Sequence, residues 1–342
     1  MPPGTPLPVL DLHLHLAASD PGDANGSWFS EKRRKSLVFR WIRRKAGLPA
    51  KDEGFDVAFR QLLASAISEA SALARAEGFS GFQAVGLAFD VTRNERGSEM
   101  TAETDFFVSN QYALRLAAEK DADHIPGLLA GLSIHPCGWS ASRMEMPEAL
   151  ELAKSQGAAL VKWLPTAQNI NPADSGSIDF AADCRRLKLP LLIHTGSEGA
   201  TRNLHPEWNN PRALEPLLKT GATIIAAHCG SRSLPHETCH FGKWIDMLPD
   251  WPNLYGDTSS LFGLRPRKLI RALDRRLVAD RLVHGSDWPV PNWPGWYWPG
   301  LSVQSVRRLS RIRNPLWRDV ATKLAAGIPE ASFTRGWDLI SH

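Results

Sequence analysis

Short apolar runs alternate with longer helix-like segments along most of the chain, and this alternation limits the possible folds more than any other feature of the sequence. The apolar runs predict strands over residues 8–16, 82–89, 127–135, 158–164, 189–194, 222–228, 253–257 and 277–284. The segments between them predict helices over residues 56–77, 105–119, 147–156, 178–187, 211–219, 239–248 and 266–275. About eight strands, each followed by a helix, is the count of a (β/α)8 barrel.

Continuous apolar stretches such as LLIH and IIAAH are typical of parallel strands that are covered on both faces. The main alternative is an open doubly wound sheet, which favours a glycine-rich loop after the first strand. Here the first strand is followed by HLAASDPGDANGSW, without a GxGxxG motif. We therefore expect an α/β protein with one (β/α)8 barrel domain over residues 1–342. Residues 17–53 predict an insertion with its own short basic helix, and residues 302–342 predict a helical C-terminal tail, with helix over 302–326.

Composition and charge exclude several classes of protein. Lys and Arg number 40 against 36 Asp and Glu, so the chain as a whole does not resemble a polyanion binder. Residues 31–45 hold eight basic residues and one acid, which indicates a basic amphipathic helix. Such a helix could bind a nucleic acid or a membrane surface, but on a near-neutral protein it is more often a solvated lid over a pocket.

The N-terminus does not resemble a signal peptide, no apolar run approaches ~18 residues, and the four cysteines form no CxxC pair. We expect a cytoplasmic protein with reduced thiols that acts on a small molecule, without a nucleic-acid or membrane partner.

Titratable side chains stand at the ends of several predicted strands. His13 and His15 are two residues apart on the first strand and so share a face, while His194, His228 and Asp287 end or follow the fifth, sixth and eighth strands. The ends of barrel strands meet at one mouth, and burying this many titratable groups there without a shared cation would be costly. Nitrogen and carboxylate ligands suit Zn²⁺ and, less specifically, Mn²⁺, Fe²⁺ or Co²⁺.

This pattern resembles that of the amidohydrolase superfamily over residues 8–290. The surrounding segments are similar to those of the amidohydrolase-related (family 2) branch of TIM-barrel metal-dependent hydrolases; they are VKWLP, LLIHTG, IIAAHCG and HGSDWP. The resemblance implies that His13, His15 and His194 are metal ligands and that Asp287 is a ligand which also holds the hydrolytic water. His228 either binds a second metal or orients water and substrate. Lys162 is a ligand only if it is carboxylated between two metals, and otherwise is a neutralising cation or a substrate contact. Whether there are one or two ions stays open.

Further residues are candidates for substrate contacts. They are His135, Glu198, Arg202, Trp163, Trp288, Trp293 and Trp296. The alternative role of His135 is a capped structural turn, and that of Glu198 and Arg202 is an ordinary helix start or surface pair. Trp288, Trp293 and Trp296 lie in the aromatic loop 287–300, which forms either a lid over a flat or apolar substrate, a hydrophobic plug or a subunit interface. Because strands one and eight are neighbours in a closed barrel, we expect tryptophans of 288–298 to touch residues 17–45 and roof the pocket.

The leading hypothesis for function is hydrolysis of an amide, ester, lactone or related bond. A cation that lowers the pKa of bound water toward ~7 would generate hydroxide, with Asp287 moving the proton and the cation or His228 polarising the scissile oxygen. The resemblance also implies an alternative, the metal-dependent non-oxidative decarboxylation of an aromatic acid. A metal-free binding protein on the same barrel is the alternative from a different class. The substrate, the preferred metal, the oligomeric state (including a homo-oligomer) and the role of residues 31–45 stay open.

Overall fold

The computed structural model describes residues 5–20, 25–139, 144–199, 201–232, 236–261, 264 and 266–340. Its main sheet has eight strands in the order β1-β3-β5-β6-β7-β8-β9-β10, and every neighbouring pair is parallel. They are β1 (Val9–His15), β3 (Phe82–Leu87), β5 (Leu128–Leu132), β6 (Leu160–Trp163), β7 (Leu191–His194), β8 (Ile224–Ala227), β9 (Leu254–Asp257) and β10 (Leu282–Val283).

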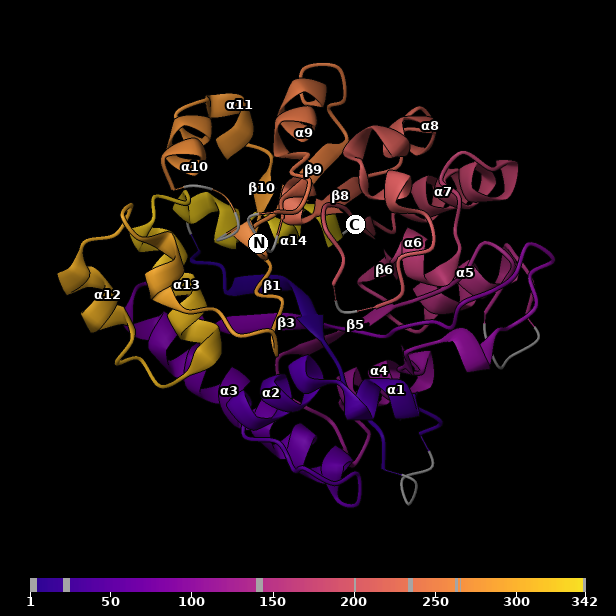
Figure 1. The fold of residues 1–342 in the computed structure, drawn as a ribbon, viewed down its shortest axis with the longest axis horizontal. Helices are drawn as coiled ribbons and strands as arrows, with labels where there is room; N and C mark the ends of the chain where they lie inside the picture. The colour runs from indigo at the N-terminus through magenta and orange to yellow at the C-terminus, as the bar shows by residue number, and fades with distance from the viewer. Residues whose placement is uncertain are drawn as a thin grey trace.

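The sheet closes on itself between its first and last strands. Leu12 N donates to His284 O at 2.9 Å, and Asp287 N donates to His13 O at 2.8 Å. Figure 1 shows the strands near the centre, with helices around them. The fold is a (β/α)8 barrel, which confirms the prediction.

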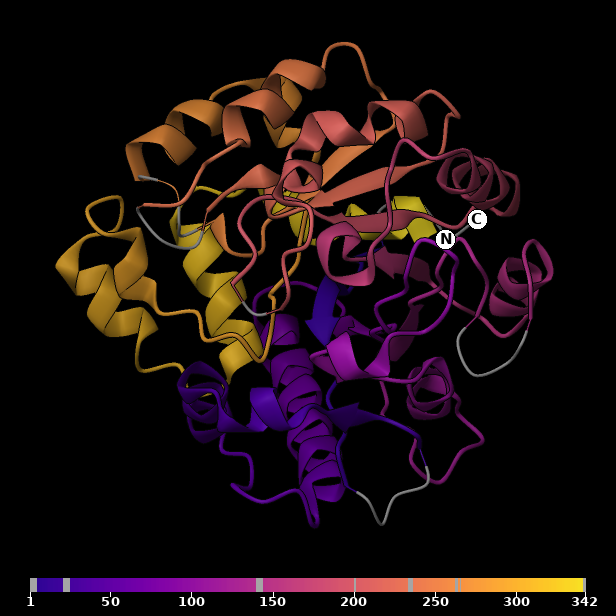
Figure 2. The ribbon, with the colours of Figure 1, turned by 45° about the vertical axis from the view of Figure 1, so that its right-hand side comes forward.

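Helices connect successive strands and cover the outside of the sheet (Figures 1 and 2). The longest is α3 (Phe55–Ala76), which buries Phe55, Phe59, Leu63 and Ile67 at intervals of four residues, as an amphipathic helix does. The others between strands are α4 (Asn110–Ala117), α5 (Glu148–Ser155), α6 (Pro165–Gln168), α7 (Ser175–Leu187), α8 (Glu215–Leu218), α9 (Phe241–Met247), α10 (Pro266–Leu273) and α11 (Arg276–Ala279). In the C-terminal part lie α12 (Val303–Leu309), α13 (Pro315–Ala325) and α14 (Gly336–Ile340).

The apolar core has two parts because successive strand residues face opposite sides of the sheet. One cluster lies inside the barrel and includes Leu160, Leu192 and Ile225, and residues of α14 pack against it. The larger cluster fills the space between the sheet and the helices.

Strand β1 departs from regular alternation just before its polar end. Leu10 and Leu12 belong to the inner cluster, whereas Leu14 and Leu16 belong to the outer cluster. The pairing register of β1 with β3 shifts between Asp11 and Leu14. Such a bulge re-aims the residues that follow it, so His13 and His15 point to the interior together.

The segment after β1 contains two helices where one short basic helix was predicted. These are α1 (Glu31–Lys35) and α2 (Leu37–Lys45), and they separate at Ser36, whose side chain caps α2 by accepting from Phe39 N. The segment is tied to the barrel by β2 (Trp28–Phe29), which pairs antiparallel with β4 (Phe106–Phe107), and by Arg43, which stacks over Phe55 of α3. Residues 21–24 of the predicted insertion lie outside the described residues.

Three other element predictions need correction. Residues 277–284 are not one strand, since α11 occupies their start and β10 only Leu282–Val283. The helix predicted over 105–119 begins at Asn110, because β4 precedes it and Ser109 caps it through Tyr112 N. The helix predicted over 211–219 divides into a 3-10 turn, Pro211–Leu214, and α8. Among the described residues, no helix is long and apolar enough to span a membrane.

Candidate metal centre

Three predicted ligand atoms converge at the carboxyl ends of β1 and β10. His13 Nε2 lies 3.2 Å from His15 Nε2 and 3.5 Å from Asp287 Oδ1, and His15 Nε2 lies 3.1 Å from the same oxygen. Atoms that share an ion at metal–ligand distances of about 2.0–2.2 Å have separations of this size. The three residues therefore fit one divalent cation.

The backbone of Asp287 is held in the left-handed region, with φ 64°. Its N–H donates to His13 O, and its Oδ2 accepts from Ser260 Oγ at 2.9 Å, so both ends of the residue are fixed. His228 and Ser260 also have positive φ, at 62° and 51°. Backbone strain of this kind concentrates at functional sites, where the surrounding structure maintains it.

Asp257, at the end of β9, was not among the predicted site residues. Its Oδ2 lies 2.7 Å from His13 Nδ1, and its Oδ1 accepts from His228 N at 2.8 Å. A carboxylate behind a ligating imidazole fixes the tautomer and the ring orientation. The signal in the sequence was the same as for the other residues, a titratable side chain that ends a predicted strand.

His13, His228 and Asp257 form a second group whose possible ligand atoms lie close together, and hydrogen bonds join its members. His13 Nδ1 is bonded to Asp257, and His228 Nδ1 lies 2.7 Å from Ser259 Oγ. Ser259 Oγ in turn donates to Asp257 Oδ1 at 2.5 Å. Because these bonds use Nδ1 of His13 and of His228, the Nε2 atom of each ring faces away from the network.

His194 and Lys162 lie on the opposite side of the same polar interior. The ring of His194 is 4.9 Å from the ring of His228, and Lys162 Nζ is 3.4 Å from His13 Nε2. His194 Nε2 is buried and has no hydrogen-bond partner within the described part of the chain. A buried imidazole nitrogen in this state is suited to ligation.

The electrostatics of the interior favour neutral imidazoles and ionised carboxylates. Burial, with the charge of Lys162, lowers the pKa of His13 to about 3, and burial also lowers the pKa of His194 well below its ordinary value. Burial lowers the pKa of Lys162 to about 8. Although burial raises the pKa of Asp287, its bond to His15 and the charges of His228 and His13 hold that pKa well below the ordinary value. Neutral histidine and ionised aspartate are the forms that bind metals.

Two of the predicted substrate residues point away from this interior. Trp163 donates from Nε1 to Ile134 O at 2.7 Å, and its ring lies 4.7 Å from that of Phe180 in α7. Since Lys162 faces inward, its strand neighbour Trp163 faces the helices, and it does not line the site. Trp288 is buried with its ring 5.5 Å from Phe59 of α3, so it belongs to the outer core.

Others lie in the loops around the barrel mouth. His135 accepts from Cys137 N at 3.1 Å, which fits the structural-turn alternative. Arg202 pairs with Glu103 at 2.5 Å, and Trp293 is 53% exposed while Trp296 is partly buried. Glu198 is buried beside His194, with Oε2 3.5 Å from Nε2.

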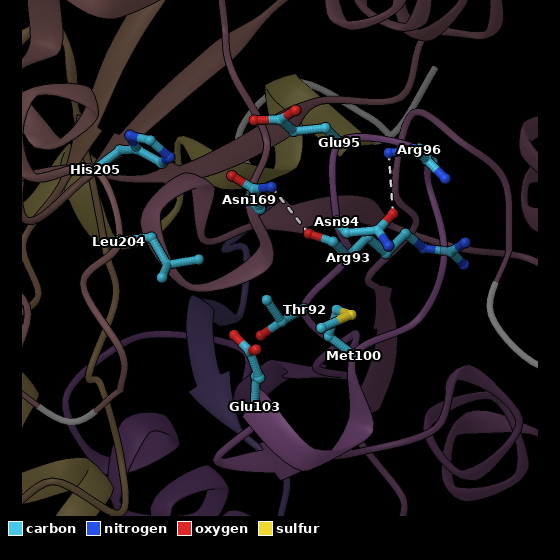
Figure 3. A pocket seen from close by; sticks show the side chains of 10 residues that line it. All are labelled: Thr92, Arg93, Asn94, Glu95, Arg96, Met100, Glu103, Asn169, Leu204 and His205. Carbon is cyan, nitrogen blue, oxygen red and sulfur yellow. Dashed lines mark hydrogen bonds between the residues drawn. The ribbon is translucent and has the colours of Figure 1, made fainter.

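Two cavities flank the Arg202–Glu103 pair. One of about 450 Å³, shown in Figure 3, is lined by Thr92, Arg93, Asn94, Glu95, Arg96, Met100, Glu103, Asn169, Leu204 and His205. Asn169 Nδ2 donates to Arg93 O at 2.9 Å and joins two of its walls. The other, of about 380 Å³, lies between α1 and the 3-10 turn Thr101–Glu103, with Arg202 in its lining. The loop after β7 therefore runs from the histidines to both cavities.

The amidohydrolase family model matches residues 10–310. No curated protein matches the sequence.

Solved structures share the fold. An uncharacterized TIM-barrel protein from Bordetella bronchiseptica has a TM-score of 0.54 at 17% identity, covering 94% of this chain and 100% of that chain. A probable 2-pyrone-4,6-dicarboxylic acid hydrolase from Acinetobacter baumannii has a TM-score of 0.53 at 14% identity, covering 98% and 100%. A 2,6-dihydroxybenzoate decarboxylase from Rhizobium has a TM-score of 0.50 at 13% identity, covering 98% and 99%.

Proposed function

The chain belongs to the amidohydrolase family, and from this premise we propose that it is a metal-dependent hydrolase of a small molecule. The observation that carries the proposal is the convergence of His13 Nε2, His15 Nε2 and Asp287 Oδ1 within 3.1–3.5 Å of one another. With His194, these residues would hold the ion, and nitrogen and carboxylate donors favour Zn²⁺ over Mn²⁺, Fe²⁺ or Co²⁺.

The protein's own groups are arranged for proton transfer. When bound, a divalent cation would supply an acidified water and polarise a carbonyl oxygen. Asp287 accepts a proton on its carboxylate and returns it to the leaving group, while Ser260 holds its Oδ2. His228 is oriented through Nδ1 by Ser259, so Nε2 is the atom that contacts the substrate.

Whether Lys162 is unmodified or carboxylated distinguishes a site with one metal ion from a site with two. We propose a single ion and an unmodified Lys162, whose ammonium lies 3.4 Å from His13 Nε2 and holds an anionic group of the substrate. Metal content near one per chain is then expected for the wild type, with Lys162→Ala retaining its metal. Two ions in the wild type, with one lost in Lys162→Ala and regained on adding short carboxylic acids, would instead show a carboxylated lysine.

The buried ammonium of Lys162 also favours a second candidate function, the decarboxylation of an aromatic acid. An ammonium beside the ligands is placed to bind a substrate carboxylate as well as an ester or lactone oxygen. The fold is shared with a decarboxylase of a dihydroxybenzoate as well as with a hydrolase, so both reactions belong in one test.

The experiment measures metal content by mass spectrometry on protein purified without chelator, together with turnover of amides, esters, lactones and aromatic acids. We expect bound metal and hydrolysis in the wild type, with both lost in His13→Ala and Asp287→Ala. His236→Ala is the control, since this residue is exposed and belongs to neither group of possible ligands. Release of CO₂ from an aromatic acid without ester or lactone turnover would select the decarboxylase. Wild-type protein without metal would contradict both.

A further inference from the structure

The helix α2 carries apolar and basic side chains together on its exposed side. Leu37, Val38 and Trp41 have 78%, 58% and 45% of their surface exposed. Three basic residues of the same helix are also exposed; they are Arg40, Arg44 and Lys45. We call these six residues the α2 surface, and we infer that it docks on an anionic phospholipid bilayer. The inference names a partner and does not depend on the proposed catalysis.

The opposite side of α2 packs against the protein, outside the strands (Figure 1), which fixes the direction of the α2 surface. The ring of Phe39 lies 4.7 Å from that of Phe29. Arg43 is buried, stacks over Phe55 and donates to Asp52 Oδ1 at 3.0 Å. Because the helix is anchored in this way, the apolar members of the α2 surface cannot turn into the core.

The members of the α2 surface are arranged so that one partner can contact them together. Leu37 and Trp41 are one helical turn apart, and Lys45 follows Trp41 by another turn, so the three lie along one side of the helix. The three basic members form no ion pair within the described part of the chain. Long basic side chains can lay their stems along an apolar phase and keep their charges at its polar boundary, so one interface suits both kinds of residue.

Charge complementarity selects a bilayer among the possible occupants. A second copy of this chain, in a symmetric contact, would bring the same positive charges against the α2 surface. A nucleic acid would supply phosphate charge but would leave Leu37 and Val38 exposed. An anionic bilayer supplies both negative headgroups and an apolar layer beneath them, which matches an amphipathic helix that lies in the interface.

The near-neutral charge of the whole chain led us to expect no membrane partner. A peripheral contact, however, depends on the charges within about a Debye length of the membrane, ~8 Å at physiological salt, and there the α2 surface is positive. A lid over a pocket was the other role expected for this helix. Residues of α2 line neither of the two cavities beside the Arg202–Glu103 pair. The local charge and the exposed apolar side chains therefore favour the bilayer.

The test measures co-sedimentation of the full-length protein with two kinds of vesicle, one of phosphatidylcholine alone and one in which phosphatidylglycerol replaces about a third of the lipid. We expect binding to the anionic vesicles only, weakened by added salt. Arg40→Gln with Arg44→Gln should lower the affinity about 5-fold for each lost charge. Leu37→Ser with Trp41→Ser should lower it about 10-fold or more, because apolar burial is lost.

Matched controls replace exposed residues of the same kinds on other helices. They are Arg307→Gln with Arg308→Gln in α12, and Leu73→Ser in α3 with Leu277→Ser in α11. Both double variants should bind anionic vesicles as the wild type does. All replaced side chains are exposed, so the variants are expected to keep the fold, which circular dichroism checks.

Three results would overturn the inference. The first is no vesicle binding, or equal binding to neutral and anionic vesicles. The second is an equal loss of binding in the control variants. The third is a self-association in solution that Leu37→Ser with Trp41→Ser abolishes, or tight binding of duplex DNA without vesicle binding, since the occupant would then be a second copy or a nucleic acid. None of these results bears on the metal content, so the proposed function is judged separately.

Discussion

Asp257 shows how much a single buried residue contributes to the geometry of the centre. One of its oxygens holds His13 Nδ1, and the other accepts from the backbone of His228 and Ser259. Burial raises the pKa of Asp257, but the charge of His13 and the bond to it lower that pKa below the ordinary value, so the carboxylate stays ionised. It therefore sets the orientation of one imidazole and the backbone position of another.

We predict that Asp257→Asn weakens metal affinity by about 10–100-fold, because an amide no longer enforces one tautomer of His13. Competition with a chelator of known affinity measures the effect. Asp274→Asn, at an exposed position, is the control. Unchanged affinity in a folded Asp257→Asn protein would show that His13 keeps its orientation without this carboxylate.

At the residue scale, the sequence predicted most of the side chains that converge at the candidate metal centre, but it missed one and misplaced another. His13, His15 and Asp287 converge because they end neighbouring strands, and strand ends of a barrel share one mouth. Asp257 was missed because no sequence motif surrounds it, although it ends a predicted strand as His194 does. The prediction that Trp163 contacts substrate was wrong, because Lys162 faces the interior and its strand neighbour therefore faces the helices, where it packs against Phe180.

At the scale of elements, the bulge in β1 has the largest effect on the site. Regular alternation over VLDLHLH would place the leucines and the histidines on opposite faces. The register shift lets Leu10 and Leu12 fill the barrel and then turns His13 and His15 to the same side. A sequence pattern of period two contains no information about where a bulge lies.

Asp11 holds this bulge, since its Oδ1 accepts from His13 N at 3.0 Å and from Ser286 N at 2.9 Å. We predict that Asp11→Asn, which keeps an acceptor oxygen, retains metal binding, whereas Asp11→Ala loses about 10-fold or more in affinity because the bulge is no longer tied to the segment of Asp287. Calorimetric titration of both variants with Zn²⁺ measures the difference. Equal affinities would show that the strand keeps its irregular path unaided.

The aromatic loop after β10 has two kinds of tryptophan. The backbone of Trp288 lies beside β1, where its carbonyl accepts from His15 N at 2.8 Å, and its ring reaches the segment after β1 through Phe59, Phe55 and Phe29. Trp293 and Trp298 are exposed. The two segments are therefore at the same end of the barrel, while direct contact of Trp293 or Trp296 with residues 17–45 stays a prediction.

We predict that Trp288→Ala lowers the free energy of unfolding by about 3–5 kcal/mol, because it empties a packed site. Trp293→Ala should leave stability unchanged and raise KM more than it lowers kcat, because a lid contact binds substrate and transition state alike. Urea unfolding and steady-state kinetics on both variants separate the two roles. An unchanged KM in Trp293→Ala would indicate the plug or interface alternative.

For the whole molecule, the C-terminal helices secure the closure of the barrel. Lys323 Nζ in α13 donates to Gly285 O at 2.6 Å and pairs with Asp319 at 2.6 Å, with both side chains buried. Trp337 at the start of α14 donates to Pro8 O at 2.9 Å, and α14 packs against the inner cluster. The alternation of strands and helices predicted the barrel, but a buried ion pair from the tail has no signature in hydrophobic periodicity.

We predict that Lys323→Met destabilises the protein by about 3–5 kcal/mol, since it leaves the Asp319 charge buried without its partner. The double variant Asp319→Asn with Lys323→Met should recover part of this loss. Denaturant titrations of the three proteins make the comparison. Equal stability of the single variant and the wild type would show that the pair is not needed at the seam.

The closure of the barrel also has a consequence for the order of events on the ribosome. His15 and Asp287 lie 3.1 Å apart but 272 residues apart in the sequence. The two imidazoles are therefore made before the carboxylate that completes their site, and most of the barrel is made between them. Until Asp287 is made, the nascent chain can offer a metal ion only the histidines of the site, and full loading awaits the docking of the last strand. Because tight binding needs the closed barrel, the ion would stabilise chains that include the last strand over chains that lack it.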